Sequence, residues 1–146
     1  MDTPKTELIR IVGSQLYDFS RELAARHADS DSPHGVTNAQ GQIVVCIAKT
    51  PGVGIKEVAS RLNITSSAVT QLVDGLVRNG LITREQDSRD RRALRLALTR
   101  QGIAECRRFE QMRADRASEL LASLSDDDLT TLERLLAQVL GQLRSS

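Results

Sequence analysis

The 146-residue sequence predicts a mainly α fold with a small β wing, that is, a short hairpin of two strands. Most of the chain repeats apolar residues at three- and four-residue steps, which is the period of an amphipathic helix. Alternation from residue to residue, typical of strands, is confined to positions 81–98. The length is enough for one domain with its own core, so residues 1–146 are interpreted as a single domain.

The first two helices are predicted before position 50. Apolar residues from Leu8 to Leu23 mark a helix near the N-terminus, and the polar stretch 29–35 ends it. Thr37 is the expected N-cap of a further helix, which Pro51 and the glycine after it stop.

A helix-turn-helix is predicted next, at 55–78. A short amphipathic helix at 55–62 is followed by Thr65, whose hydroxyl can cap a second helix. That helix has one apolar stripe, and Gly75 within it predicts close packing or close approach. Gln71 on its polar face can form two hydrogen bonds with adenine. The polar face of this helix carries Ser67, Thr70, Gln71, Asp74 and Arg78. Of these, Ser67, Thr70, Gln71 and Arg78 are the candidate DNA-facing residues.

The hairpin follows directly. Gly80 is a typical C′ glycine, and strands are expected at 81–85 and 94–98, the second with Leu94, Leu96 and Leu98 on one face. A basic hairpin tip beside a reading helix suits a neighbouring minor groove, where negative potential is concentrated. The basic residues of the tip are Arg89, Arg91 and Arg92.

Together these elements resemble the MarR family of winged-helix transcription factors. The motifs that carry the resemblance are Leu62-Asn63-Ile64-Thr65, Val69-Thr70, Leu72-Val73-Asp74, Leu76, Gly80-Leu81-Ile82, Asp90-Arg91-Arg92 and Leu98-Thr99-x-x-Gly102. The resemblance implies a winged helix-turn-helix DNA-binding lobe at 37–99, flanked by dimerisation helices at 1–30 and 100–146. It also implies that Ser66, Ser67, Thr70 and Gln71 face DNA, that Arg92 enters the minor groove, and that Asp90 braces the wing.

Charge is segregated along the chain although the formal net charge is only +1. Residues 78–100 contain seven arginines and three acids, whereas residues 110–133 contain seven acids and two arginines. This asymmetry allows one region to attract phosphate while the other stays away from it.

Beyond the hairpin, a long helix is predicted to about Leu124, and a last one begins at Ser125 and three aspartates. The apolar faces of the terminal helices exceed what a small winged helix needs, which favours a homodimer with two-fold symmetry. Such a dimer reads two half-sites of a pseudo-palindromic double-stranded operator, about one helical turn apart.

The function expected is that of a sequence-specific transcriptional repressor, released from its operator by a small effector. The resemblance implies an anionic or phenolic effector, and the candidate pocket residues are Tyr17, Phe19, Arg21 and His34. An architectural DNA-binding protein without an effector, and a helical protein–protein adaptor, are the alternatives.

Other chemistry has little support in the sequence. Cys46 lies in an apolar run and is expected to be a buried structural thiol; neither it nor Cys106 has metal-ligand or disulfide spacing. His27 and His34 flank an acidic loop that lacks further well-spaced ligands, so no metal is expected. There is no nucleophile motif and no glycine-rich phosphate loop, so neither an enzyme nor a cofactor is expected. No apolar run spans a membrane and no leader is apparent, which predicts a cytoplasmic protein.

Overall fold

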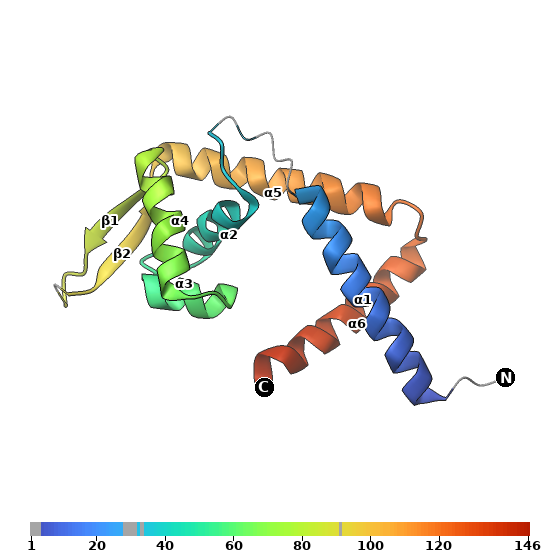
Figure 1. Cartoon of the computed structure of the whole chain (residues 1–146). Coiled ribbons are helices and arrows are strands. Elements are labelled where there is room, and N and C mark those ends of the chain that lie inside the picture. Colours follow the sequence, from blue (N-terminus) through green and yellow to red (C-terminus); the bar gives the residue numbers. More distant parts are fainter. Residues whose placement is uncertain (1–3, 28–31, 33, 91) are drawn as a thin grey trace. The chain divides into compact units, whose positions relative to one another are not determined.

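The computed structural model describes residues 4–27, 32, 34–90 and 92–146, and it confirms a mainly helical fold with a two-stranded wing (Figure 1). The chain divides into two compact units, Met1–Cys106 and Arg107–Ser146. The elements are α1 (Lys5–His27), α2 (Asn38–Lys49), α3 (Ile55–Leu62), α4 (Ser66–Arg78), β1 (Ile82–Gln86), β2 (Leu94–Leu98), α5 (Arg100–Leu121) and α6 (Asp126–Ser145).

The two predicted N-caps, Thr37 and Thr65, are confirmed, and Ser125 caps the last helix. Thr37 Oγ1 accepts from the Gln40 backbone N–H at 3.2 Å, and Thr65 Oγ1 accepts from that of Ala68 at 3.1 Å. Ser125 Oγ accepts from the Asp128 backbone N–H at 3.2 Å. Each hydroxyl satisfies one of the N–H groups that the first turn of a helix leaves without a partner.

The core of the winged helix lies where α2 contacts α3, α4 and β2. The loop before α3 joins the sheet, because the Val53 carbonyl accepts from the Leu96 backbone N–H at 2.9 Å. Cys46 and Cys106 are both buried, and burial raises the pKa of the Cys46 thiol, as expected for a structural cysteine. Large side chains of this core are Val36, Ile43, Val44, Val53, Val58, Val69, Val73, Leu76, Leu81, Ile82 and Leu96.

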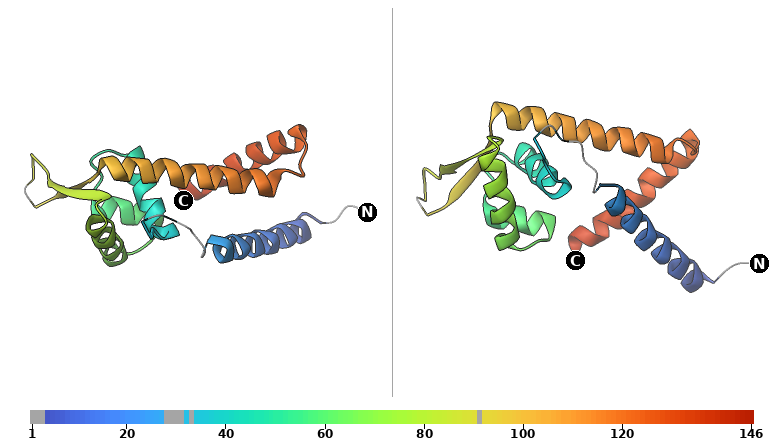
Figure 2. Two further views of the ribbon diagram at one scale, coloured as in Figure 1. Left: turned by 90° about the horizontal axis from the view of Figure 1, so that it is seen from above. Right: turned by 45° about the horizontal axis from the view of Figure 1, so that its top comes forward.

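The wing is an antiparallel hairpin beside α4 (Figures 1 and 2). β1 begins at Ile82, one residue later than predicted, because the Leu81 N–H bonds to the Leu76 carbonyl at 2.9 Å and so belongs to the end of α4. Leu96 is fully buried as the alternation predicts, but Leu94 is 43% exposed. It pairs with Gln86 at the distal end of the hairpin, next to the turn rather than the core.

The wing passes into α5 through Thr99. Its Oγ1 donates to the Gly80 carbonyl at 2.6 Å and accepts from the Gly102 N–H at 3.1 Å. A β-carbon at position 102 would lie 2.0 Å from the Leu81 carbonyl oxygen. The spacing Thr99-x-x-Gly102 therefore combines a helix cap with a close approach between two backbones.

α1 and α6 each expose an apolar face. The exposed residues recur at three- and four-residue steps, so each set forms one stripe along its helix. They are Leu8, Ile11, Val12, Leu16 and Phe19 in α1, and Leu135, Leu136, Val139, Leu140 and Leu143 in α6. Among the residues described, none of the helices has the length and apolar character needed to cross a membrane.

Candidate DNA-binding surface

The exposed face of α4 carries the predicted reading residues. Ser66, Ser67, Thr70 and Gln71 are all exposed at the N-terminal half of the helix. Arg78 is exposed three turns beyond Ser67, on the same face. Thr70 Oγ1 donates to the Ser66 carbonyl at 2.9 Å, which leaves its oxygen able to accept. The structure thus gathers these side chains on one polar row with short side chains at its N-terminal end.

The tip of the wing is closed by carboxylates that bind backbone N–H groups. Asp87 Oδ1 accepts from the Arg89 N–H at 2.8 Å, and Asp90 Oδ1 accepts from the Arg92 N–H at 3.0 Å. Asp90 therefore orients the turn through the backbone of Arg92. Arg91 lies outside the described residues.

Two ion pairs in this region were not predicted from the sequence. Arg84 of β1 pairs with Asp74 of α4, and Arg95 Nε of β2 donates to Asp87 Oδ2 at 3.0 Å. The first pair joins the wing to α4 at their solvent-exposed side. The second pair joins β2 to the turn.

The ion pairs also separate the arginines into two groups. Arg84 and Arg95 are compensated by carboxylates, whereas Arg78, Arg89 and Arg92 have no carboxylate partner within the part of the chain described. The latter three are exposed. An exposed guanidinium without an internal partner is the group best suited to a phosphate.

The charge on Asp87 should make the wing sensitive to acid. The N–H of Arg89, and then the guanidinium of Arg95, hold the pKa of the Asp87 carboxyl below its usual value of 3.8. Because the folded pKa is lowered, the ionised carboxylate contributes stability above about pH 4, and this contribution is lost as the pH falls through the folded pKa.

We therefore expect Asp87→Asn, which keeps an acceptor for Arg89 but loses the charge, to lower the free energy of unfolding near pH 6. The difference from the wild type should shrink toward about pH 2.5. Urea unfolding at both pH values measures it, and an equal difference at both would show that the charge of Asp87 does not stabilise the wing.

The four candidate pocket residues lie on two segments. Tyr17, Phe19 and Arg21 are in α1, where Tyr17 is 80% exposed and Arg21 pairs with Asp18 at 2.7 Å. His34 is exposed in the segment before α2, and its carbonyl accepts from Asn79 Nδ2 at 3.2 Å.

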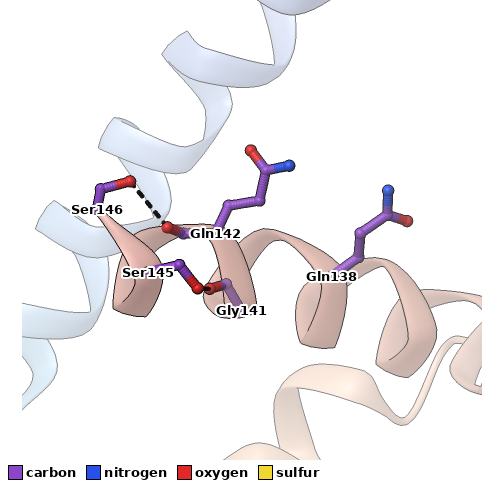
Figure 3. Close-up of a pocket in the computed structure, with 5 residues that line it drawn as sticks. All are labelled: Gln138, Gly141, Gln142, Ser145 and Ser146. Atoms are coloured by element: carbon purple, nitrogen blue, oxygen red, sulfur yellow. Dashed lines mark hydrogen bonds between the residues drawn. The ribbon is translucent and has the colours of Figure 1, made fainter.

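An open hollow of about 540 Å³ lies along the last turns of α6 (Figure 3). None of the four candidate pocket residues lines it, and its own lining has no charged side chain. Two of its hydroxyls already donate to backbone carbonyls one turn earlier. Its polar groups that can still donate are the side-chain amides of Gln138 and Gln142, and it does not coincide with the predicted pocket. The lining residues are Gln138, Gly141, Gln142, Ser145 and Ser146.

Comparison with known proteins agrees with this geometry. The family model described as "MarR family" matches residues 36–94. The multiple antibiotic resistance protein MarR of Escherichia coli is 32% identical over 110 residues, covering 75% of this chain and 76% of that protein. The HTH-type transcriptional repressor YetL of Bacillus subtilis is 25% identical over 130 residues, covering 88% of this chain and 78% of that protein.

Solved structures show the same relationship. A crystal structure of an E. coli MarR mutant complexed with operator DNA superimposes with a TM-score of 0.75 and 27% sequence identity. The match covers 95% of this chain and 99% of that chain.

Proposed function

The chain belongs to the MarR family of DNA-binding transcriptional regulators, and from this premise we propose that it acts as a repressor, bound as a homodimer to a pseudo-palindromic operator. The repressor assignment is supported by similarity to YetL, whose name describes that activity. Binding of double-stranded DNA is supported by similarity to a MarR structure that contains operator DNA.

One observation carries the proposal: the polar row on α4 lies next to a wing whose tip exposes Arg89 and Arg92, neither of which has a carboxylate partner among the described residues. α4 enters the major groove, where Gln71 and the hydroxyls of Ser66, Ser67 and Thr70 reach base edges and nearby phosphates. Arg92 at the tip of the wing enters the adjacent minor groove, and Arg78 and Arg89 bind phosphates. The pair Arg84–Asp74 keeps the two reading elements in register with each other.

The homodimer is supported by the apolar stripes of α1 and α6. Contiguous apolar surface of this kind is rarely left in contact with water by a soluble protein. Burial of both stripes against a second copy of the chain would place two reading heads on one DNA molecule. A two-fold dimer of this kind matches inverted half-sites about 10 base pairs apart.

The proposal includes a small effector. This ligand favours a geometry of the dimer that does not match the spacing of the operator. Its effect is limited by its differential affinity for the two geometries. Tyr17, Phe19, Arg21 and His34 remain the proposed pocket residues, since an aromatic ring and a cation suit a phenolic anion. Release of the operator duplex by a panel of phenolic carboxylates tests this; if no compound changes DNA affinity, the proposed phenolic effector is wrong.

Substitutions in the two reading elements should have different effects. Gln71→Ala removes a base contact and should reduce discrimination between operator and random DNA by about 1–3 kcal/mol.

Arg92→Ala should weaken binding to both DNAs and reduce the slope of log affinity against log salt by about 0.9. Anisotropy titrations at several salt concentrations separate the two, and an equal loss on both DNAs for Gln71→Ala would contradict its base-reading role.

The proposed function as a whole is tested by selection from a random duplex library with the full-length protein. The expected product is an inverted repeat whose half-sites are about 10 base pairs apart, centre to centre. Recovery of no preferred sequence would instead favour a protein–protein adaptor or an architectural protein.

A further inference from the structure

Gln40, which lies outside the predicted DNA-reading surface, reaches the backbone of the recognition helix α4. Its Nε2 donates to the Leu72 carbonyl at 3.4 Å, while its Oε1 accepts from the Thr37 N–H at 3.1 Å. The side chain is half-buried. Because both ends of the amide are engaged, its orientation is determined, and one side chain joins the cap of α2 to α4.

Gly75 provides the space that this amide occupies. A β-carbon at position 75 would lie 2.7 Å from Gln40 Nε2, closer than such a contact allows. Glycine inside a helix costs stability relative to alanine, so its presence in α4 needs a compensating reason. The approach of the Gln40 amide to the helix backbone supplies that reason.

A second contact, from the chain just before α2, reaches the end of α4. Asn79 Nδ2, at the C-cap, donates to the His34 carbonyl at 3.2 Å. The contacts at Leu72 and Asn79 are seven residues apart, so they fall two turns apart on one side of the helix. Two such points constrain both the direction and the rotation of α4, and thus where Ser67 and Gln71 are presented.

We propose that Gln40 is a positioning residue for DNA reading and that Gly75 is the complementary position that admits its amide. The inference rests on the proposed function of operator binding. Gln40 lies in α2 and touches α4 through a main-chain carbonyl, so its effect is on the placement of the reading side chains. Loss of this contact should therefore reduce discrimination between DNA sequences more than it reduces affinity for DNA in general.

Two full-length variants change this contact, and a third serves as the control. Gln40→Glu keeps an oxygen that accepts from the Thr37 N–H but cannot donate to Leu72. Gly75→Ala displaces the amide by sterics, without a change of charge. Ser125→Ala is the matched control, because it removes the hydroxyl cap of α6 and leaves Gln40, Thr37 and α4 unchanged.

The readout is the ratio of the affinity for a library-selected duplex to that for a scrambled duplex of equal length. The ratio cancels the uniform repulsion that a new carboxylate adds on both DNAs. Gln40→Glu and Gly75→Ala should each reduce it roughly threefold to tenfold, the range expected for loss of one hydrogen bond. The double variant should lose no more than the worse single variant, because both changes break one contact. Ser125→Ala should lower Tm and leave the ratio within about twofold.

Multiplicative losses in the double variant, or an unchanged ratio in Gln40→Glu, would overturn the positioning role. A double-mutant cycle of melting temperatures, measured without DNA, tests the contact separately. Gly75→Ala should raise Tm in a Gln40→Ala background, where the methyl group has space, and should not raise it in the wild type. A wild-type ratio near one would refute the proposed function and the reading role together. If Gly75→Ala raises Tm equally in both backgrounds, the Gln40–Gly75 contact itself is refuted.

Discussion

Replacement of Leu136 and Leu140 in α6 by glutamate should convert the protein to monomers and reduce operator affinity by about 10³-fold or more. Both side chains belong to the exposed apolar stripe of α6, and a carboxylate buried in a dimer interface without a partner is strongly unfavourable. A monomer presents one α4 and one wing, so it keeps only one half-site and approaches the affinity of non-specific binding. Sedimentation and DNA anisotropy measure the two effects on the same samples.

The matched control adds the same charge to the other side of α6. Thr130 and Gln138 are exposed and lie away from the apolar stripe, so Thr130→Glu/Gln138→Glu should remain dimeric and bind the operator. If the leucine variant also remains dimeric, or binds the operator as a monomer with undiminished affinity, the dimer proposed from the two stripes is wrong.

Gly102→Ala should be the most destabilising single-methyl change among the described glycines. The new β-carbon would lie 2.0 Å from the oxygen and 3.1 Å from the carbon of the Leu81 carbonyl, and both atoms belong to the main chain. The same oxygen accepts from the Thr99 N–H at 3.0 Å, so displacement of Leu81 also disturbs the junction between β2 and α5. A cost of about 1–3 kcal/mol is expected for such overpacking, which corresponds to a fall in Tm of roughly 4–12 °C.

Gly141→Ala is the control for this substitution. Gly141 lies in an exposed part of α6, and nothing lies within 4 Å of a β-carbon built there. Alanine should therefore stabilise that helix, by up to about 1 kcal/mol. Calorimetry of the two variants tests the packing, and equal melting temperatures would contradict the close approach of the two backbones at Gly102.

Local features of the fold were predictable because their causes lie within a few residues. The caps at Thr37, Thr65 and Ser125 and the C′ glycine at Gly80 each depend on a side chain or a backbone conformation next to the helix end. The predicted start of β1 was one residue too early. Leu81 completes the end of α4 by a backbone hydrogen bond, which the alternation of apolar residues in the sequence cannot reveal.

Contacts between elements were not predictable. Arg84 meets Asp74, and Gln40 meets Leu72, only because the elements that carry them pack together. The sequence does contain one signal of the second contact, the glycine at position 75, which predicted close packing or close approach without naming the partner. For the candidate pocket, the residues proposed lie on separate segments, and no local pattern relates α1 to the segment at His34.

The most direct test of sequence-specific DNA reading is a titration of the full-length protein with a library-selected duplex and with a scrambled duplex, near physiological salt. Two chains should bind the selected duplex at least about 10³-fold more tightly than the scrambled one, with an affinity that falls steeply as salt is raised. Equal affinity for the two duplexes would contradict sequence-specific reading by α4 and the wing.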